Sequence, residues 1–186
     1  MNLFRSFYLW ARKYMLHIDD RSQLEIAVEN GLKIGKDVAI MGEVILDPGH
    51  CWLIEIGNNV TIAPRVHILA HDASTKRALG YTKISRVIIG DNVFLGAGCI
   101  ILPGVSIGNN VVVGAGSVVT KNVPDNSVCV GNPASVIDNW NHYMDKNREK
   151  MITAPLFDES YQIGRITEDR KQEMIKRVDK KTGYVV

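Results

Sequence analysis

The chain has 186 residues, of which 46% are hydrophobic, so it is long and apolar enough to bury a core and is not expected to be disordered. Its 22 lysine and arginine residues nearly balance 20 aspartate and glutamate residues, and a net charge of +2 is too small for a general nucleic-acid or membrane-binding field. Any anion must therefore bind at a local cluster of basic residues.

The amino-terminal stretch MNLFRSFYLWARKYML mixes charged with apolar residues, which favours a helix over a signal peptide or a transmembrane span. We expect a helical cap over residues 1–20. The three cysteines, Cys51, Cys99 and Cys129, lack C-x-x-C spacing, so neither a disulfide framework nor a zinc site is indicated. This cysteine usage fits a reducing cytoplasm.

A repeat of six residues dominates the middle of the chain. Stepping by six from Ile89 reaches an apolar residue each time, at Leu95, Ile101, Ile107, Val113 and Val119. The residue after each is mostly glycine, and the fifth position of each hexad is small or β-branched. The same frame occurs upstream in runs that begin at Ile34 and Ile56, with one insertion after each run.

A hexad is too short for a helix pair, and its glycines and β-branched residues favour a short strand plus a turn. Three such segments would close a triangular coil of about eighteen residues, and stacked coils form an all-β fold, the parallel β-helix, with the repeat residues inside. We expect this β-helix over residues 30–137. The extension 138–186 is predicted to be mostly helical, at 138–150 and 167–181, with TAPLFD extended between the helices.

The hexads, with IGDNVFLGAGCIILPGVSIGNNVVVGAGSVVTKNVPDN and the later GNPA, resemble the hexapeptide-repeat acyltransferases. The likeness is strongest to the branch of maltose and galactoside O-acetyltransferases and polysaccharide-modifying sugar O-acetyltransferases. The resemblance implies a left-handed β-helix, a homotrimer with active sites between subunits, and acetyl-CoA as the acyl donor. It spans roughly residues 30–137.

In VHILAHDASTKR the repeat is interrupted just before the loop 73–86, and His71 matches the position of the family's general base. Imidazole, with an ordinary pKa of about 6.5, can take a hydroxyl proton at neutral pH. Without the resemblance, a polar turn residue is the plainer interpretation of His71; with it, His71 is predicted to be the catalytic base. His67 is interpreted as structural. Asp72 could orient the imidazole, but neighbours on one chain seldom point at each other, so a backbone carbonyl is an equal candidate.

Four residues are candidates for acceptor binding: Asp47, His50, Asp72 and Tyr81. Asp47 falls where galactoside-type relatives carry an acceptor-binding aspartate, although it also suits a turn before Pro48. His50 lies in the first insertion, and Tyr81 could stack on a sugar ring. The loop 73–86 is basic, which indicates either a solvated surface or a phosphate contact.

Acetyl-CoA would bind along the ridge of small turn residues and the GNPA segment, at Ala97, Ala115, Gly116, Thr120, Lys121 and Gly131. Small residues allow close approach of the ligand, and Lys121 could meet a phosphate as a point charge. Small residues also simply suit tight corners. Ser135 stands where some relatives carry a basic residue beside the GNPA segment, which leaves phosphate recognition there open.

The predicted function is therefore acetyl transfer from acetyl-CoA to a sugar or glycan-precursor hydroxyl, with no resident metal. Xenobiotic or amino-acid acetylation is an alternative acceptor class, although the long amino-terminal helical region of serine acetyltransferases is not evident. Two further alternatives are a γ-carbonic-anhydrase-like zinc enzyme, using His50, His67 and His71, and a non-catalytic trimeric scaffold. Metal content separates the first of these from an acetyltransferase.

Overall fold

The computed structural model describes residues 22–186, so the helical cap expected over residues 1–20 lies outside the described residues. The chain divides after Ile137 into two compact units. Within residues 22–186, every helix is too short or too polar to cross a lipid bilayer.

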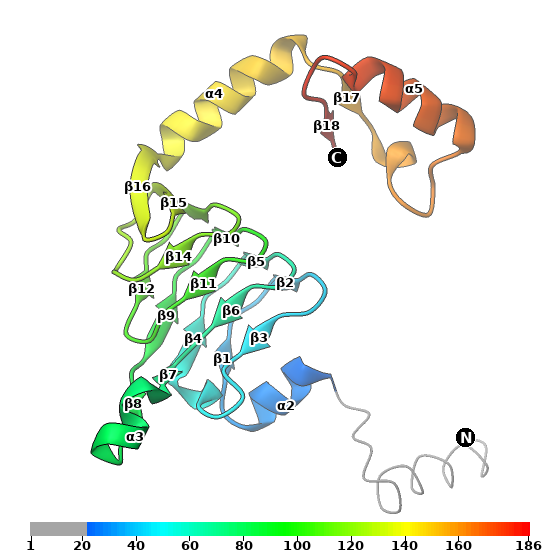
Figure 1. The fold of residues 1–186 in the computed structure, drawn as a ribbon. Coiled ribbons are helices and arrows are strands. Elements are labelled where there is room, and N and C mark those ends of the chain that lie inside the picture. The colour runs from blue at the N-terminus through cyan, green and yellow to red at the C-terminus, as the bar shows by residue number, and fades with distance from the viewer. Residues whose placement is uncertain (1–21) are drawn as a thin grey trace, which may run out of the picture. The chain divides into compact units, whose positions relative to one another are not determined.

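The first unit consists of three parallel sheets that the chain visits in turn (Figure 1). One sheet contains β1 (Lys33–Ile34), β4 (Ile54–Ile56), β9 (Val87–Ile89) and β12 (Ser106–Ile107). The second contains β2 (Ala39–Ile40), β5 (Thr61–Ile62), β10 (Val93–Leu95), β13 (Val111–Val113), β15 (Ser127–Gly131) and β16 (Ala134–Asn139). The third contains β3 (Ile45–Leu46), β6 (His67–Ile68), β11 (Ile100–Ile101) and β14 (Val118–Val119). Successive strands fall in successive sheets, so the backbone winds as a three-sided coil.

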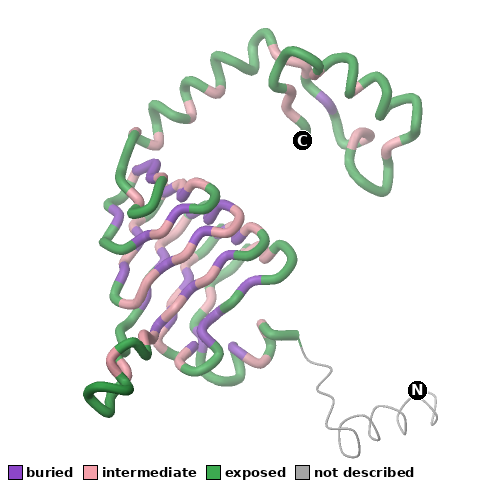
Figure 2. Tube along the Cα trace, in the orientation of Figure 1, coloured by how far each residue is buried: buried purple, intermediate pink, exposed green. Residues whose placement is uncertain are grey.

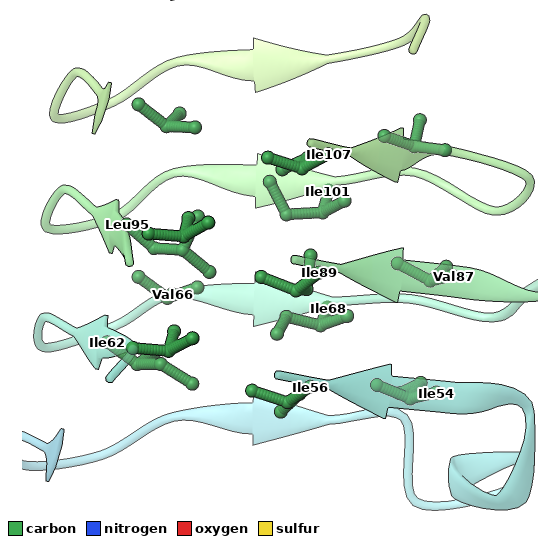
Figure 3. Close-up of a cluster of buried hydrophobic side chains, with 14 of the residues drawn as sticks. Ile54, Ile56, Ile62, Val66, Ile68, Val87, Ile89, Leu95, Ile101 and Ile107 are labelled. Atoms are coloured by element: carbon green, nitrogen blue, oxygen red, sulfur yellow. The ribbon is translucent and has the colours of Figure 1, made fainter. Parts of the chain in front are cut away.

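The strand register confirms the hexad columns. Ile89 pairs with Ile107 in the first sheet and Leu95 with Val113 in the second, so one full coil returns after eighteen residues. Upstream, Ile56 pairs with Ile89 across the second insertion, which therefore leaves the column undisturbed. Figure 3 shows Ile56, Ile89, Leu95 and Ile107 among the side chains gathered in the interior between the sheets.

Burial follows the same columns and alternates along most strands of the coil, such as β4, β9, β10 and β13, as a two-residue period requires. Val93 and Leu95 are buried while Phe94, between them, is 45% exposed. Cys99 and Cys129 also lie inside, as free thiols. Figure 2 shows buried and partly exposed positions alternating along the coils. Each fully buried Ile, Leu or Val contributes about 1.5–3 kcal/mol, so the interior column is the main source of stability.

Glycine follows the repeat residue because neighbouring coils approach closely at that corner. A Cβ on Gly57 would lie 2.7 Å from the carbonyl oxygen of Gly90, and a Cβ on Gly90 would lie 2.7 Å from that of Gly108. Real Cβ atoms do not approach so closely, so these positions at the ends of strands in the first sheet admit only glycine without a backbone shift.

Helix α2 (Gln23–Glu29) precedes the first coil and begins with a capping box between Ser22 and Glu25. Its Ala27 belongs to the core together with Leu32, which directly follows the helix. At the other end, β15 and β16 are hydrogen-bonded neighbours joined through Asn132 and Pro133, within the GNPA segment.

Two insertions leave the coil at the corner between the third and first sheets. The first contains the 3-10 turn η1 (Cys51–Leu53). The second contains β7 (His71–Asp72), the 3-10 turn η2 (Ala73–Thr75), α3 (Lys76–Leu79) and β8 (Lys83–Ile84). Strands β7 and β8 pair antiparallel, so the loop expected over 73–86 is closed at its base by a two-stranded ribbon.

The second unit, residues 138–186, contains two helices separated by extended chain, in line with the sequence pattern. Its elements are α4 (Trp140–Thr153), β17 (Leu156–Phe157), η3 (Glu159–Tyr161), α5 (Glu168–Val178) and β18 (Tyr184–Val185). Strands β17 and β18 pair parallel, and Phe157 is buried beneath the guanidinium of Arg177, which lies 4.7 Å from its ring centroid. This small unit therefore has a small buried core of its own, centred on Phe157.

Candidate active site

Asp47 is a fully buried carboxylate at the point where the first insertion begins. It directly follows β3, and its backbone N–H still donates to the carbonyl of Ile68 in the next coil. Its Oδ2 accepts a hydrogen bond from the backbone N–H of Ala70 at 2.6 Å, and its Oδ1 accepts from the backbone N–H groups of Gly49 and His50. The carboxylate is thus held rigidly by backbone from both insertions.

His71 completes this arrangement. Its Nδ1 lies 2.7 Å from Oδ2 and 2.8 Å from Oδ1 of Asp47, and its side chain is one-third exposed. An ionised carboxylate can only accept, so the shared proton resides on Nδ1 of His71. In the neutral ring, Nε2 then carries the lone pair, which is the state that a general base requires.

The pKa of Asp47 supports an ionised carboxylate. Burial acts to raise it, but the hydrogen bond from His71 and those from the backbone N–H groups of Ala70 and Gly49 outweigh burial and lower it from 3.8. Asp47 therefore stays charged at neutral pH and stabilises an imidazolium when His71 takes up a proton.

The geometry differs from two expectations about this pair. Asp47 is shielded from solvent, and its carboxylate oxygens are engaged by His71 and by backbone N–H groups, so they are not exposed to an acceptor. Neither Asp72 nor a backbone carbonyl orients His71, because the buried carboxylate of Asp47 occupies that place. Asp72 instead caps η2 through the N–H of Ser74 and forms an ion pair with Lys83 of β8, which lowers its pKa.

His50 lies beside the catalytic candidate. The ring centroids of His50 and His71 are 5.1 Å apart, and the ring of Trp52 lies 5.3 Å beyond His50. Trp52 is 52% exposed and was not singled out by the sequence. Nδ1 of His50 is buried and has no hydrogen-bond partner among the described residues.

The same three side chains could hold a metal ion. One ligand atom each from Asp47, His50 and His71 lie within 4.8 Å of one another. This group differs from the zinc alternative drawn from the sequence, because Asp47 replaces His67. His67 instead lies at an outward-facing position of β6, between Ile45 and Ile100 of the neighbouring strands.

The basic loop is partly neutralised. Lys83 pairs with Asp72, and Arg86 pairs with Glu55 on the adjacent face at 2.7 Å. Tyr81 is 80% exposed, so its ring is available to a ligand or to another subunit. Its backbone carbonyl accepts a hydrogen bond from Thr75, which fixes the loop internally.

The residues expected to bind the donor fall at two different corners of the coil. Thr120 and Lys121 follow β14, at the corner from which His71 departs two coils earlier. Ala97 and Ala115 lie at the opposite end of the third sheet, where the N–H of Gly116 donates to the carbonyl of Ala97. Gly131 ends β15, and its N–H donates to the buried hydroxyl of Ser117. Within one chain, the ridge at Ala97 and Ala115 therefore lies at one end of the strands of the third sheet, and His71 lies at the other end.

Comparison with known proteins agrees with the coil and its columns. Residues 86–121 match the model described as the hexapeptide repeat of succinyl-transferase. The crystal structure of a maltose O-acetyltransferase from Clostridium difficile 630 superposes with a TM-score of 0.52 and 31% identity, covering 75% of this chain and 89% of that one. The chain belongs to the hexapeptide-repeat acyltransferase family.

Among curated relatives, the chain is 52% identical over 99 residues to Protein CapG of Staphylococcus aureus, covering 51% of this chain and 58% of that protein. It is 51% identical over 83 residues to a galactoside O-acetyltransferase of Lactococcus lactis subsp. lactis (strain IL1403), covering 45% of this chain and 39% of that protein. The matched region thus spans less than two thirds of the length of each of these relatives.

Proposed function

We propose that the protein is an acetyl-CoA-dependent O-acetyltransferase that acetylates a hydroxyl group of a sugar or glycan precursor. The observation that carries the proposal is the His71–Asp47 pair, in which a buried, ionised carboxylate holds Nδ1 and leaves the lone pair of Nε2 facing away from it. Families that use this chemistry need such a base, because an alcohol is a poor nucleophile until its proton is removed.

The reaction needs one proton carrier. Nε2 of His71 takes the acceptor's hydroxyl proton as the oxygen attacks the thioester carbonyl carbon, and Asp47 stabilises the imidazolium. Collapse of the tetrahedral intermediate breaks the C–S bond, and the same proton passes from Nε2 to the departing thiolate. General base catalysis of this kind is worth ~10² to 10⁴-fold in rate.

A homotrimer with sites between subunits is part of the proposal, as is the left-handed sense of the coil. Family membership supports both. The separation of the Ala97 and Ala115 ridge from His71 within one chain supports the trimer, because a second copy could bring its own ridge to this corner. Exposed apolar side chains on the projecting loop, Leu79, Tyr81 and Ile84, are suited to contact such a neighbour.

The donor would be bound by backbone and small residues of the coil, with Lys121 as a cationic group at the corner from which His71 departs two coils earlier. Acetyl-CoA offers amides and phosphates to such a groove. Lys121 is exposed, as a phosphate-binding side chain at the edge of a groove must be.

The proposal is tested by incubating the purified chain with acetyl-CoA and a panel of pyranosides, amino sugars, serine and chloramphenicol. Free coenzyme A and the acetylated product are then measured together. We expect an O-acetylated sugar in amounts equal to the coenzyme A released. Transfer only to an amine, only to serine or chloramphenicol, or to no acceptor would overturn it.

A zinc enzyme is the second candidate, because the structure brings Asp47, His50 and His71 together. Metal analysis of the purified protein separates the two functions. An O-acetyltransferase is expected to keep full activity after chelation, whereas one tightly bound zinc per chain and loss of activity on its removal would favour the metalloenzyme.

A further inference from the structure

The first insertion fixes an exposed aromatic side chain next to the catalytic pair. Cys51 is buried, and its thiol donates to the carbonyl oxygen of Ala27 at 3.5 Å, which ties η1 to α2. At Gly31 a Cβ would lie only 3.1 Å from Cβ of Trp52, so the base of the tryptophan is packed against the end of that helix. The indole of Trp52 is therefore anchored at its base and 52% exposed.

Three rings form a continuous row from this indole to the general base. The spacing is 5.3 Å from Trp52 to His50 and 5.1 Å from His50 to His71, with tilts of 49° and 46°. A cyclic molecule whose hydroxyl reaches His71 could therefore also contact His50 and Trp52. The faces of aromatic rings are electronegative and attract polarised C–H groups, such as those on one face of a sugar ring.

His50 adds a directional polar group to this row. Its Nδ1 is the buried edge of the ring, 3.8 Å from the carboxylate oxygen Oδ1 of Asp47. Because that neighbour is negative, the tautomer with the proton on Nδ1 is favoured. The exposed 29% of the side chain then includes the opposite edge, where Nε2 carries a lone pair.

We propose that His50 and Trp52 form an acceptor subsite that selects cyclic molecules with two neighbouring hydroxyl groups. One hydroxyl donates to Nε2 of His71 and is acetylated. The adjacent hydroxyl donates to Nε2 of His50, and the C–H face of the ring lies against Trp52. This inference rests on the proposed acetyl transfer and names the acceptor class and the residues that recognise it.

The test compares two acceptors that differ by one hydroxyl, cis-1,2-cyclohexanediol and cyclohexanol, with acetyl-CoA as donor. Wild-type protein is expected to prefer the diol by about tenfold in kcat/KM, because the second hydroxyl makes one additional hydrogen bond. His50→Phe keeps a ring in the row but removes Nε2, so the preference for the diol should disappear.

Trp52→Ala is expected to raise KM for both acceptors by about three- to tenfold while leaving KM for acetyl-CoA unchanged. Trp52→Phe retains a ring face and should restore most of the loss, which separates stacking from a folding defect. Thermal unfolding of each variant serves as the control.

The outcomes distinguish this inference from the proposed function. If wild-type protein transfers acetyl groups but His50→Phe keeps the diol preference, or if Trp52→Ala leaves acceptor KM unchanged, the subsite is wrong. If wild-type protein releases no coenzyme A with any alcohol, the acetyltransferase proposal itself fails.

Discussion

The Asp47→Asn substitution separates the orienting role of the carboxylate from simple packing. In the wild type, four donors aim at the two carboxylate oxygens: Nδ1 of His71 and the backbone N–H groups of Ala70, Gly49 and His50. An asparagine side chain of the same shape offers one acceptor oxygen and one NH₂ group. One or two of the four donors must therefore face another donor, depending on whether the ring proton of His71 moves to Nε2.

The expected cost follows from that count. A buried donor left without an acceptor costs ~1–3 kcal/mol, so the free energy of unfolding should fall by about 1–6 kcal/mol. If the NH₂ group faces His71, it donates to Nδ1 and moves the ring proton to Nε2. The base is then lost, and kcat should fall by ~10² to 10⁴-fold.

Asp91→Asn is the matched control. Asp91 accepts from the backbone N–H of Asn58 at a coil corner, and the next coil places Asn109 at the equivalent position with the same type of bond. We expect this variant to keep wild-type kcat. Stability is measured by urea unfolding and kcat by release of coenzyme A. Asp47→Asn protein with wild-type kcat would refute the orienting role.

Three further predictions concern pH, coil packing and the donor. The pKa of Asp47 is lowered on folding, so its contribution to stability is present above its ordinary pKa of 3.8 and is lost as pH falls through the lowered value. Urea unfolding from pH 7 to 3 should show the stability difference between wild type and Asp47→Asn shrinking only below about pH 4, whereas a difference independent of pH would contradict this. Gly90→Ala would place a Cβ 2.7 Å from a carbonyl oxygen, so we expect a loss of about 1–3 kcal/mol in unfolding free energy, and unchanged stability would show that the coils can separate there. Lys121→Gln should raise KM for acetyl-CoA about threefold at low salt and less at high salt, whereas a KM that is insensitive to the substitution would remove Lys121 from the donor site.

The coil was predictable from the sequence because its signal is local and repeated. Each hexad places one residue inside, and the observed pairing of Ile56 with Ile89 follows the same frame although an insertion separates them. The glycines that end the strands of the first sheet are an equally local signal, since the close approach of coils recurs each time the chain leaves that sheet. The helical cap over residues 1–20 stays a prediction.

The site was predictable only in part. His71 stands out because the repeat breaks there, but its partner is 24 residues away. A signal for Asp47 did exist: it follows Leu46 as Leu69 follows Ile68, so it occupies the same column one coil earlier and lies next to the second insertion. Asp72 is a weaker candidate than Asp47 for orienting the imidazole, because it follows His71 directly on a strand, where the side chains of neighbours point to opposite faces.

Trp52 had no comparable signal. A tryptophan in a short insertion is equally compatible with the core, and its exposure depends on how η1 packs against α2. The thiol contact of Cys51 and the close approach of Gly31 decide that packing, and both involve residues about twenty positions upstream. Sequence periodicity carries no information about such a contact.

The central claim is that Nε2 of His71 is the base for acetyl transfer, and its most direct test is kcat of His71→Ala measured alongside calorimetric binding of acetyl-CoA. We expect kcat to fall by at least ~10²-fold with acetyl-CoA affinity nearly unchanged, because the imidazole acts on the acceptor's proton. A His71→Ala protein that transfers acetyl groups at the wild-type rate would contradict the claim.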